Sequence, residues 1–187
     1  MRADAPAAVP TALPHPHPHQ HPHPHPLPAR PPARPGPLAA LHITSAATAV
    51  LLGLVAIGAM IHEPVLIPPL AASAALVNSV PTLPLAQPRS VVVGHLLGAV
   101  VGYGVLAAAG SSAWAAAVAA GITLAVLMVA RTPHSPACAT AVIVVLQSPA
   151  PTRFVPLLLG ASVLVVGAGY AASRVRPKAP KYPAYWW

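Results

Sequence analysis

Four long apolar segments constrain the fold of this chain more than any other feature. They cover residues 38–61, 90–110, 113–130 and 154–173. Each is close to the roughly 20 residues that an α-helix needs to cross the hydrocarbon core of a bilayer. Only 6% of the residues are charged and 56% are hydrophobic, which leaves too little charge to cover a soluble domain. We therefore predict an all-α, multi-pass protein of the cell membrane whose main partner is the lipid bilayer.

Two shorter segments, residues 64–80 and 133–147, are interrupted by proline. Proline is tolerated in the first turn of a helix and breaks it elsewhere, so each segment should form a short helix that begins at its prolines. Aligning Pro69 with Pro136 places Ser73 on Thr140. Broken segments in corresponding positions of two similar halves are typical of transporters and point to their substrate site. We expect the two short helices to pack side by side at the centre, related by a pseudo-twofold axis.

The N-termini of these short helices are the predicted anion site. A helix N-terminus offers free N–H groups and about half a positive charge. The candidate substrate-binding residues are Ser73, Arg89, His95, Arg131, His134 and Thr140. Around Arg131, a plain reverse turn at the lipid phosphates is an equal alternative. Glu63 is either a proton site or a loop residue at the interface, and its place at a helix end favours the loop.

A family resemblance rests on the block Pro84-Leu85-Ala86-Gln87-Pro88-Arg89 and the pair Gly94-His95. These residues resemble the HPP family of integral membrane proteins, and the similarity extends over residues 41–174. Ser135 stands where the first proline of the His-Pro-Pro motif is expected. The resemblance implies a membrane protein with four spans, and relatives in plastids and cyanobacteria are associated with nitrite transport.

The arginines and lysines constrain the topology. If both short segments cross, the chain makes six crossings and only Arg153 lies opposite the other cations, in agreement with the positive-inside rule. If both re-enter, it makes four, and Arg89, Arg131 and Arg153 lie opposite both tails. We favour four long helices plus two short ones that reach deep into the membrane, with both termini cytoplasmic.

The two tails differ from the transmembrane domain, residues 38–173. Residues 1–37 are rich in proline and histidine and should be an extended, disordered arm. Its imidazoles could bind a metal weakly, but no cysteine or carboxylate fixes a coordination shell, so we expect no metal site and no cofactor. Residues 174–187 combine cations with aromatic residues, which suits a membrane surface. The cations do not cluster as a nucleic-acid site would require.

These features favour a transporter or channel for a small anion, and the resemblance makes nitrite the first candidate. The alternative is a structural or assembly membrane protein. Gly94, Gly98 and Gly102 recur every four residues and would allow a close helix contact, within the chain or in a homo-oligomer. An enzyme is not expected: His134 and Cys138 would share a helix face, but no third residue orients the imidazole.

Overall fold

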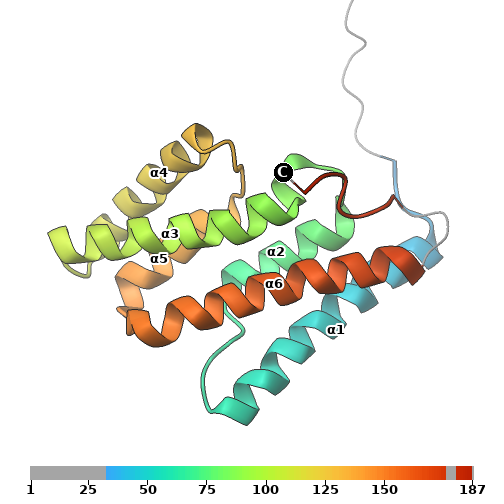
Figure 1. The fold of residues 1–187 in the computed structure, drawn as a ribbon, viewed down its shortest axis with the longest axis horizontal. Coiled ribbons are helices and arrows are strands. Elements are labelled where there is room, and N and C mark those ends of the chain that lie inside the picture. The colour runs from blue at the N-terminus through green and yellow to red at the C-terminus, as the bar shows by residue number, and fades with distance from the viewer. Residues whose placement is uncertain (1–32, 176–179, 187) are drawn as a thin grey trace, which may run out of the picture. The chain divides into compact units, whose positions relative to one another are not determined.

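The computed structural model describes residues 33–175 and 180–186, and in these ranges it contains helices and no strand. The elements are α1 (Pro37–Ile61), α2 (Pro68–Ser79), the 3₁₀ turn η1 (Pro84–Ala86), α3 (Pro88–Ala109), α4 (Ala113–Val129), α5 (Pro136–Gln147) and α6 (Pro151–Val175) (Figure 1). Every described α-helix except α4 begins on a proline, whose fixed φ angle suits a first turn. The all-α prediction is confirmed. The predicted arm, residues 1–37, lies almost entirely outside the described residues.

Three of the four predicted long spans are long and apolar enough to cross a bilayer. These are α1, α3 and α6, with 25, 22 and 25 residues and a mean hydropathy of 2.0 each. The remaining predicted span forms α4, which has 17 residues. At about 1.5 Å per residue, α4 is about 25 Å long, slightly less than the hydrocarbon core. The short segments form α2 and α5, with 12 residues each.

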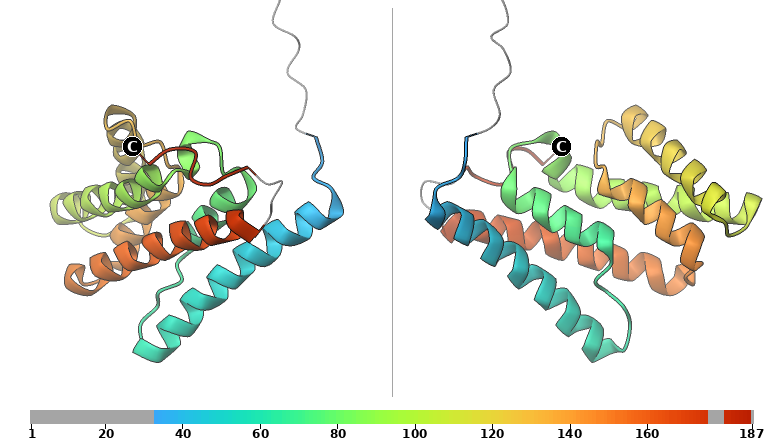
Figure 2. Two further views of the ribbon diagram at one scale, coloured as in Figure 1. Left: turned by 45° about the vertical axis from the view of Figure 1, so that its right-hand side comes forward. Right: turned by 180° about the vertical axis from the view of Figure 1, so that it is seen from behind.

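Consecutive helices alternate in direction along the described chain (Figures 1 and 2). At one end, Nε2 of His42 near the start of α1 lies 3.1 Å from the carbonyl oxygen of Ala172 near the end of α6. At the opposite end, Arg153 at the start of α6 pairs with Glu63 in the loop after α1, with 2.8 Å between Nη1 and Oε1. Both short helices run from one of these ends toward the other.

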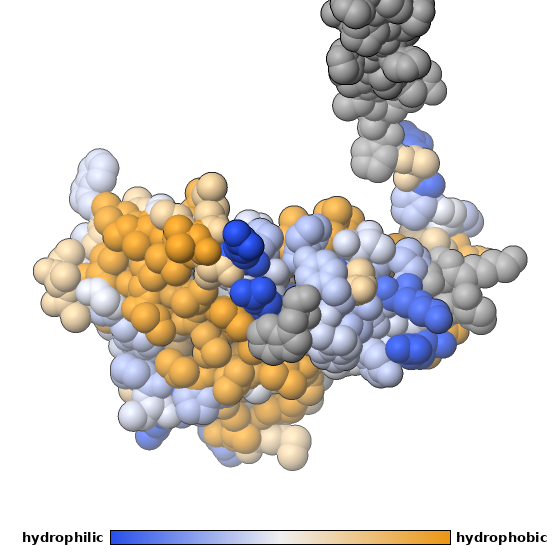
Figure 3. Space-filling model, turned by 45° about the horizontal axis from the view of Figure 1, so that its top comes forward, coloured by the Kyte–Doolittle hydropathy of each residue, from blue (hydrophilic) through white to orange (hydrophobic). Residues whose placement is uncertain are grey.

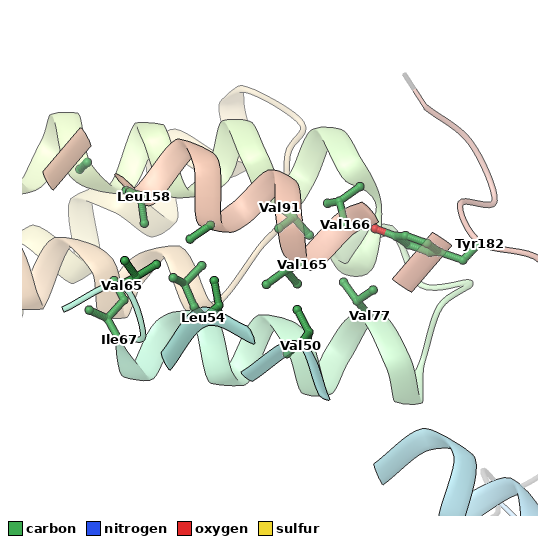
Figure 4. Close-up of a cluster of buried hydrophobic side chains, with 14 of the residues drawn as sticks. Val50, Leu54, Val65, Ile67, Val77, Val91, Leu158, Val165, Val166 and Tyr182 are labelled. Atoms are coloured by element: carbon green, nitrogen blue, oxygen red, sulfur yellow. The ribbon is translucent and has the colours of Figure 1, made fainter. Parts of the chain in front are cut away.

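The two short helices contact each other inside the bundle. α5 packs on α3 and α4, and α2 packs on α1 and α6. Seen from behind, α2 and α5 lie between α1 and α4 (Figure 2). Figure 4 shows the larger hydrophobic cluster, which joins Leu54 of α1, Val77 of α2, Val91 of α3 and Val165 of α6. The pseudo-twofold relation between the halves remains a prediction.

The glycines of α3 bring that helix close to α5. A Cβ atom added at Gly94 would lie 2.9 Å from Cβ of His134, and one added at Gly98 would overlap the carbonyl oxygen of Ala137. A side chain at Gly98 would therefore push the two backbones apart, and one at Gly94 would displace His134. In this chain the glycine ridge of α3 serves contact within one molecule.

The outward faces of the helices are apolar. Leu41, Trp114 and Val129 are 65%, 86% and 86% exposed, and Figure 3 shows a broad hydrophobic surface on one face. Exposed apolar patches of this kind are rare on soluble monomers, and they are expected where a protein faces lipid.

Candidate functional site

A buried polar cluster lies where α2, α3 and α5 meet. It consists of Ser73 on α2, His95 on α3, Thr140 on α5 and His134, which precedes α5. We call these four residues the histidine cluster. None of their side chains is more than 1% exposed. Buried polar groups are stable only when they are hydrogen-bonded, and here the partners come from within the cluster and from nearby backbone.

His95 is held from both sides by the two hydroxyls that the alignment of the short segments pairs, those of Ser73 and Thr140. Its Nε2 atom lies 2.8 Å from Oγ of Ser73, and its Nδ1 atom lies 2.8 Å from Oγ1 of Thr140. The short helices thus converge on one imidazole of α3. The serine and threonine fix the plane of the ring and the position of both nitrogens.

His134 joins the same network from the loop before α5. Its Nδ1 atom lies 2.8 Å from the carbonyl oxygen of Leu85, and its Nε2 atom lies 2.9 Å from Oγ of Ser73 and 3.3 Å from Nε2 of His95. The two rings meet edge to face, with centroids 4.8 Å apart. Both nitrogens of His134 are therefore occupied by groups other than Cys138. Because α5 begins at Pro136, His134 and Cys138 do not form the helical pair considered above.

The partners assign the hydrogens of the neutral rings. A carbonyl oxygen can only accept, so Nδ1 of His134 carries the hydrogen and its Nε2 must accept. The Ser73 hydroxyl has one hydrogen, which cannot serve both imidazoles. Nε2 of His95 must therefore be protonated, and Thr140 must donate to its Nδ1. Every ring nitrogen then has a partner.

The loop that carries His134 is positioned by the end of α4. The N–H groups of Arg131 and Thr132 donate to the carbonyl oxygens of Met128 and Leu127, at 3.2 and 3.0 Å, and Arg131 adopts a left-handed φ of 54°. This pair of bonds is a Schellman motif. Nη2 of Arg89 donates to the carbonyl oxygen of Ala130 at 3.2 Å, so α3 also holds this loop.

Four of the six predicted site residues form the cluster, and two lie elsewhere. Arg89 is half-buried and braces the loop, whereas Arg131 is exposed. The sequence did not predict Thr132, whose buried Oγ1 has no hydrogen-bond partner among the described residues. Glu63, predicted to be a loop residue or a proton site, forms its ion pair with Arg153 outside the cluster.

The turn around η1 connects the cluster to the C-terminal segment. Leu85 accepts from His134, while the next carbonyl, of Ala86, accepts from the hydroxyl of Tyr182 at 2.8 Å. Oε1 of Gln87 accepts from the N–H groups of Ala184 and Tyr185, at 2.9 and 3.4 Å. Tyr182 is buried, and burial raises the pKa of its hydroxyl. Tyr182 belongs to the stretch 174–187 that was expected at the membrane surface, and the sequence did not predict this contact, although Gln87 belongs to the block that carries the resemblance.

A groove opens between α2 and the start of α5, and no residue of the histidine cluster lines it. Its volume is about 440 Å³, and its walls include Ala72, Ser135 and Pro136. Ala72 neighbours Ser73 along the chain, and Ser135 neighbours His134. In the part of the chain that the structure describes, no group of three or more His, Cys, Asp or Glu side chains could hold a metal ion.

Comparison with known proteins places the chain in a family. A transmembrane protein of Dictyostelium discoideum is 36% identical over 132 residues, which are 66% of this chain and 46% of that protein. A second transmembrane protein of the same organism is 32% identical over 126 residues, 63% of this chain and 40% of that protein. This chain thus spans less than half the length of either relative, and no solved structure matches it. The family described as HPP, transmembrane region, matches residues 30–183, including Tyr182 and the whole histidine cluster. The chain therefore belongs to the HPP transmembrane family.

Proposed function

We propose that this protein carries a small anion across the membrane, with nitrite as the first candidate, and that the histidine cluster is part of the path. The observation that carries the proposal is the convergence of Ser73, His95, His134 and Thr140 inside an apolar helix bundle. Polar and ionisable groups at such depth are costly and commonly mark a solute or ion path.

The electrostatics of the cluster favour an anion. Its four side chains include no carboxylate, and Glu63 is paired with Arg153. The first turn of α5 begins two residues after His134, so the positive end of its dipole lies beside the cluster. The N–H groups of Ala137 and Cys138 in that turn donate to the carbonyl oxygens of His134 and Ser135, at 3.0 and 3.1 Å. The buried hydroxyl of Thr132 adds a donor that no described residue uses. The groove lined by Ser135 and Pro136 is the proposed approach.

A structural or assembly role is the second candidate. The ring nitrogens of the cluster are all satisfied within the protein, and Gly98 brings α3 against α5. A network of this kind could simply hold three helices together. The two candidates differ in whether any anion crosses.

Uptake by proteoliposomes that contain the full chain tests the proposal. The panel is nitrite, nitrate, formate and chloride, with empty liposomes as background. We expect uptake of at least one anion and a decrease of about tenfold or more in His95→Gln, because that change replaces the imidazole that bonds both Ser73 and Thr140 with an amide. Arg131→Gln should lower uptake less, since Arg131 is exposed and its charge is screened.

Ser162→Ala is the matched control. Ser162 is also buried, but it lies on α6, and its hydroxyl donates to the carbonyl oxygen of Leu159 at 2.9 Å. Its uptake should equal that of the wild type. If the wild-type protein takes up no anion of the panel above the background of empty liposomes, transport is rejected and the assembly role is favoured.

A further inference from the structure

The Ser73 hydroxyl has three hydrogen-bond partners, one more than the neutral cluster needs. Its Oγ atom lies 2.8 Å from Nε2 of His95, 2.9 Å from Nε2 of His134 and 2.9 Å from the carbonyl oxygen of Pro69. In the neutral cluster, His95 donates to Ser73, and the single hydroxyl hydrogen can point to either of the other two partners. The carbonyl of Pro69 is thus a spare acceptor.

That spare acceptor lets the cluster take one more proton. If Nε2 of His134 gains a hydrogen, it donates to Oγ of Ser73, and Nδ1 continues to donate to Leu85. Ser73 then accepts from both imidazoles with its two lone pairs and turns its own hydrogen to Pro69. Every N–H and O–H group remains bonded. The only movement required is rotation of one hydroxyl hydrogen.

The extra positive charge has no anionic side chain to neutralise it. The titratable side chains on the elements packed around the imidazole pair are Arg89, Tyr103, Arg131, Cys138, Arg153, Tyr170, Arg174 and Tyr182. None of these is a carboxylate. An unpaired charge in a buried site is unfavourable, so the proton is retained when an anion from outside binds with it.

From this geometry we infer that the histidine cluster is a one-proton site that loads together with the anion, with Ser73 as the pivot. The inference deepens the proposed transport function and rests on it for the identity of the anion. The proton binds to Nε2 of His134 and leaves from the same atom, and no bond of the anion changes. One proton and one monovalent anion then cross together without net charge.

Proteoliposomes loaded with a pH-sensitive dye test the coupling, with nitrite as the probe and empty liposomes as background. We expect one proton to enter per nitrite, and uptake to follow the pH gradient but not an imposed membrane potential.

Ser73→Ala should lose the dependence on the pH gradient. Its neutral cluster survives because the two Nε2 atoms, 3.3 Å apart, can bond directly, but its protonated cluster lacks the shared acceptor. Ser162→Ala should behave as the wild type. Charge-carrying uptake without protons, or normal coupling in Ser73→Ala, would overturn the inference.

Nitrogen-15 NMR of histidine-labelled protein in bilayers separates this inference from transport itself. His95→Gln and His134→Gln identify the two signals. Between about pH 8 and about pH 5, the ordinary range of imidazole titration, one ring should become imidazolium in wild type with nitrite, and not in Ser73→Ala. A proton gained without nitrite uptake would reject transport and keep the proton site. If the imidazoles of His95 and His134 both stay neutral in the presence of nitrite, the proton site is rejected, even if nitrite crosses the membrane.

Discussion

The two short helices start from similar sequences and perform different tasks. Each begins on a proline and places a hydroxyl in its first turns, and these hydroxyls bind opposite nitrogens of His95. The alignment that pairs Pro69 with Pro136 also pairs Ile67 with His134. Ile67 lines a cavity of about 270 Å³ that also holds the Glu63–Arg153 ion pair in its wall, whereas His134 completes the cluster. The two helices thus share a proline start and a hydroxyl, and one residue ahead of the helix places the second imidazole on the α5 side only.

The helices are also held by different means. α5 lies against the backbone of α3 at Gly98 and Gly102, and the side chain of His134, ahead of α5, lies against Gly94. α2 meets a glycine once, at Gly169 of α6, where an added Cβ atom would overlap Val77. After α2, the chain enters the η1 turn, which Tyr182 clamps through the Ala86 carbonyl. The position of α5 thus depends on close backbone contact with α3. The C-terminal part of α2 and the turn after it are held by the side chains of Val77 and Tyr182.

Gly98→Ala should have the largest effect on stability, because the new methyl group meets the backbone oxygen of Ala137. Overpacking typically costs about 1–3 kcal/mol, and a clash with backbone belongs at or above the upper end of that range. Gly104→Ala on the same helix is the control, because nothing lies within 4 Å of its added Cβ atom. Thermal unfolding in detergent measures both variants. Equal midpoints for the two would show that α5 does not rest on this glycine.

Thr140→Val should cost about 1–3 kcal/mol, because it leaves Nδ1 of His95 without a hydrogen-bond donor in a buried site. Ser73→Ala should cost less, although Ser73 has more partners, since the two Nε2 atoms can bond directly. Unfolding of both variants at neutral pH gives the order. A larger loss for Ser73→Ala would mean that the neutral imidazole pair depends on the serine, which contradicts the assigned tautomers.

The sequence predicted the elements of this structure better than their contacts. Proline positions and apolar length located all six described helices, because both properties act locally. The alignment of the two short segments paired Ser73 with Thr140, and the structure places both hydroxyls on His95. The repeat of two halves stays a prediction. The predicted span 113–130 ends one residue later than α4, because Ala130 has helical backbone angles but is the C-cap of the helix. Such an end depends on the Schellman bonds that follow it.

The remaining contacts depend on partners distant in the chain. His134 binds the backbone carbonyl of Leu85 in the η1 turn. Every residue has a backbone carbonyl, so the residue type at position 85 does not indicate this partner. Tyr182 was assigned to the membrane surface from its cationic neighbours, yet it is buried against Ala86, which precedes it by 96 positions. Arg131 looked like a site residue because it lies near His134 in sequence. The left-handed turn at Arg131 leaves its side chain exposed.

The smallest expected effect concerns the clamp beyond α2. Tyr182→Phe removes one buried hydrogen bond and should lower stability at neutral pH by about 1 kcal/mol. Burial raises the pKa of Tyr182 in the folded protein, while the unfolded chain titrates near its usual value of about 10. The contribution of the neutral hydroxyl is therefore complete below about pH 10, and it is lost as the pH rises from there toward the folded pKa. The wild type should lose its advantage over Tyr182→Phe in that alkaline range, as measured by unfolding midpoints across pH.

Tyr185→Phe is the control, because Tyr185 is 43% exposed and its N–H group, not its ring, binds Gln87. A gap between wild type and Tyr182→Phe that stays constant into alkaline solution would show that the tyrosine is not buried and that the end of α2 is held by other contacts.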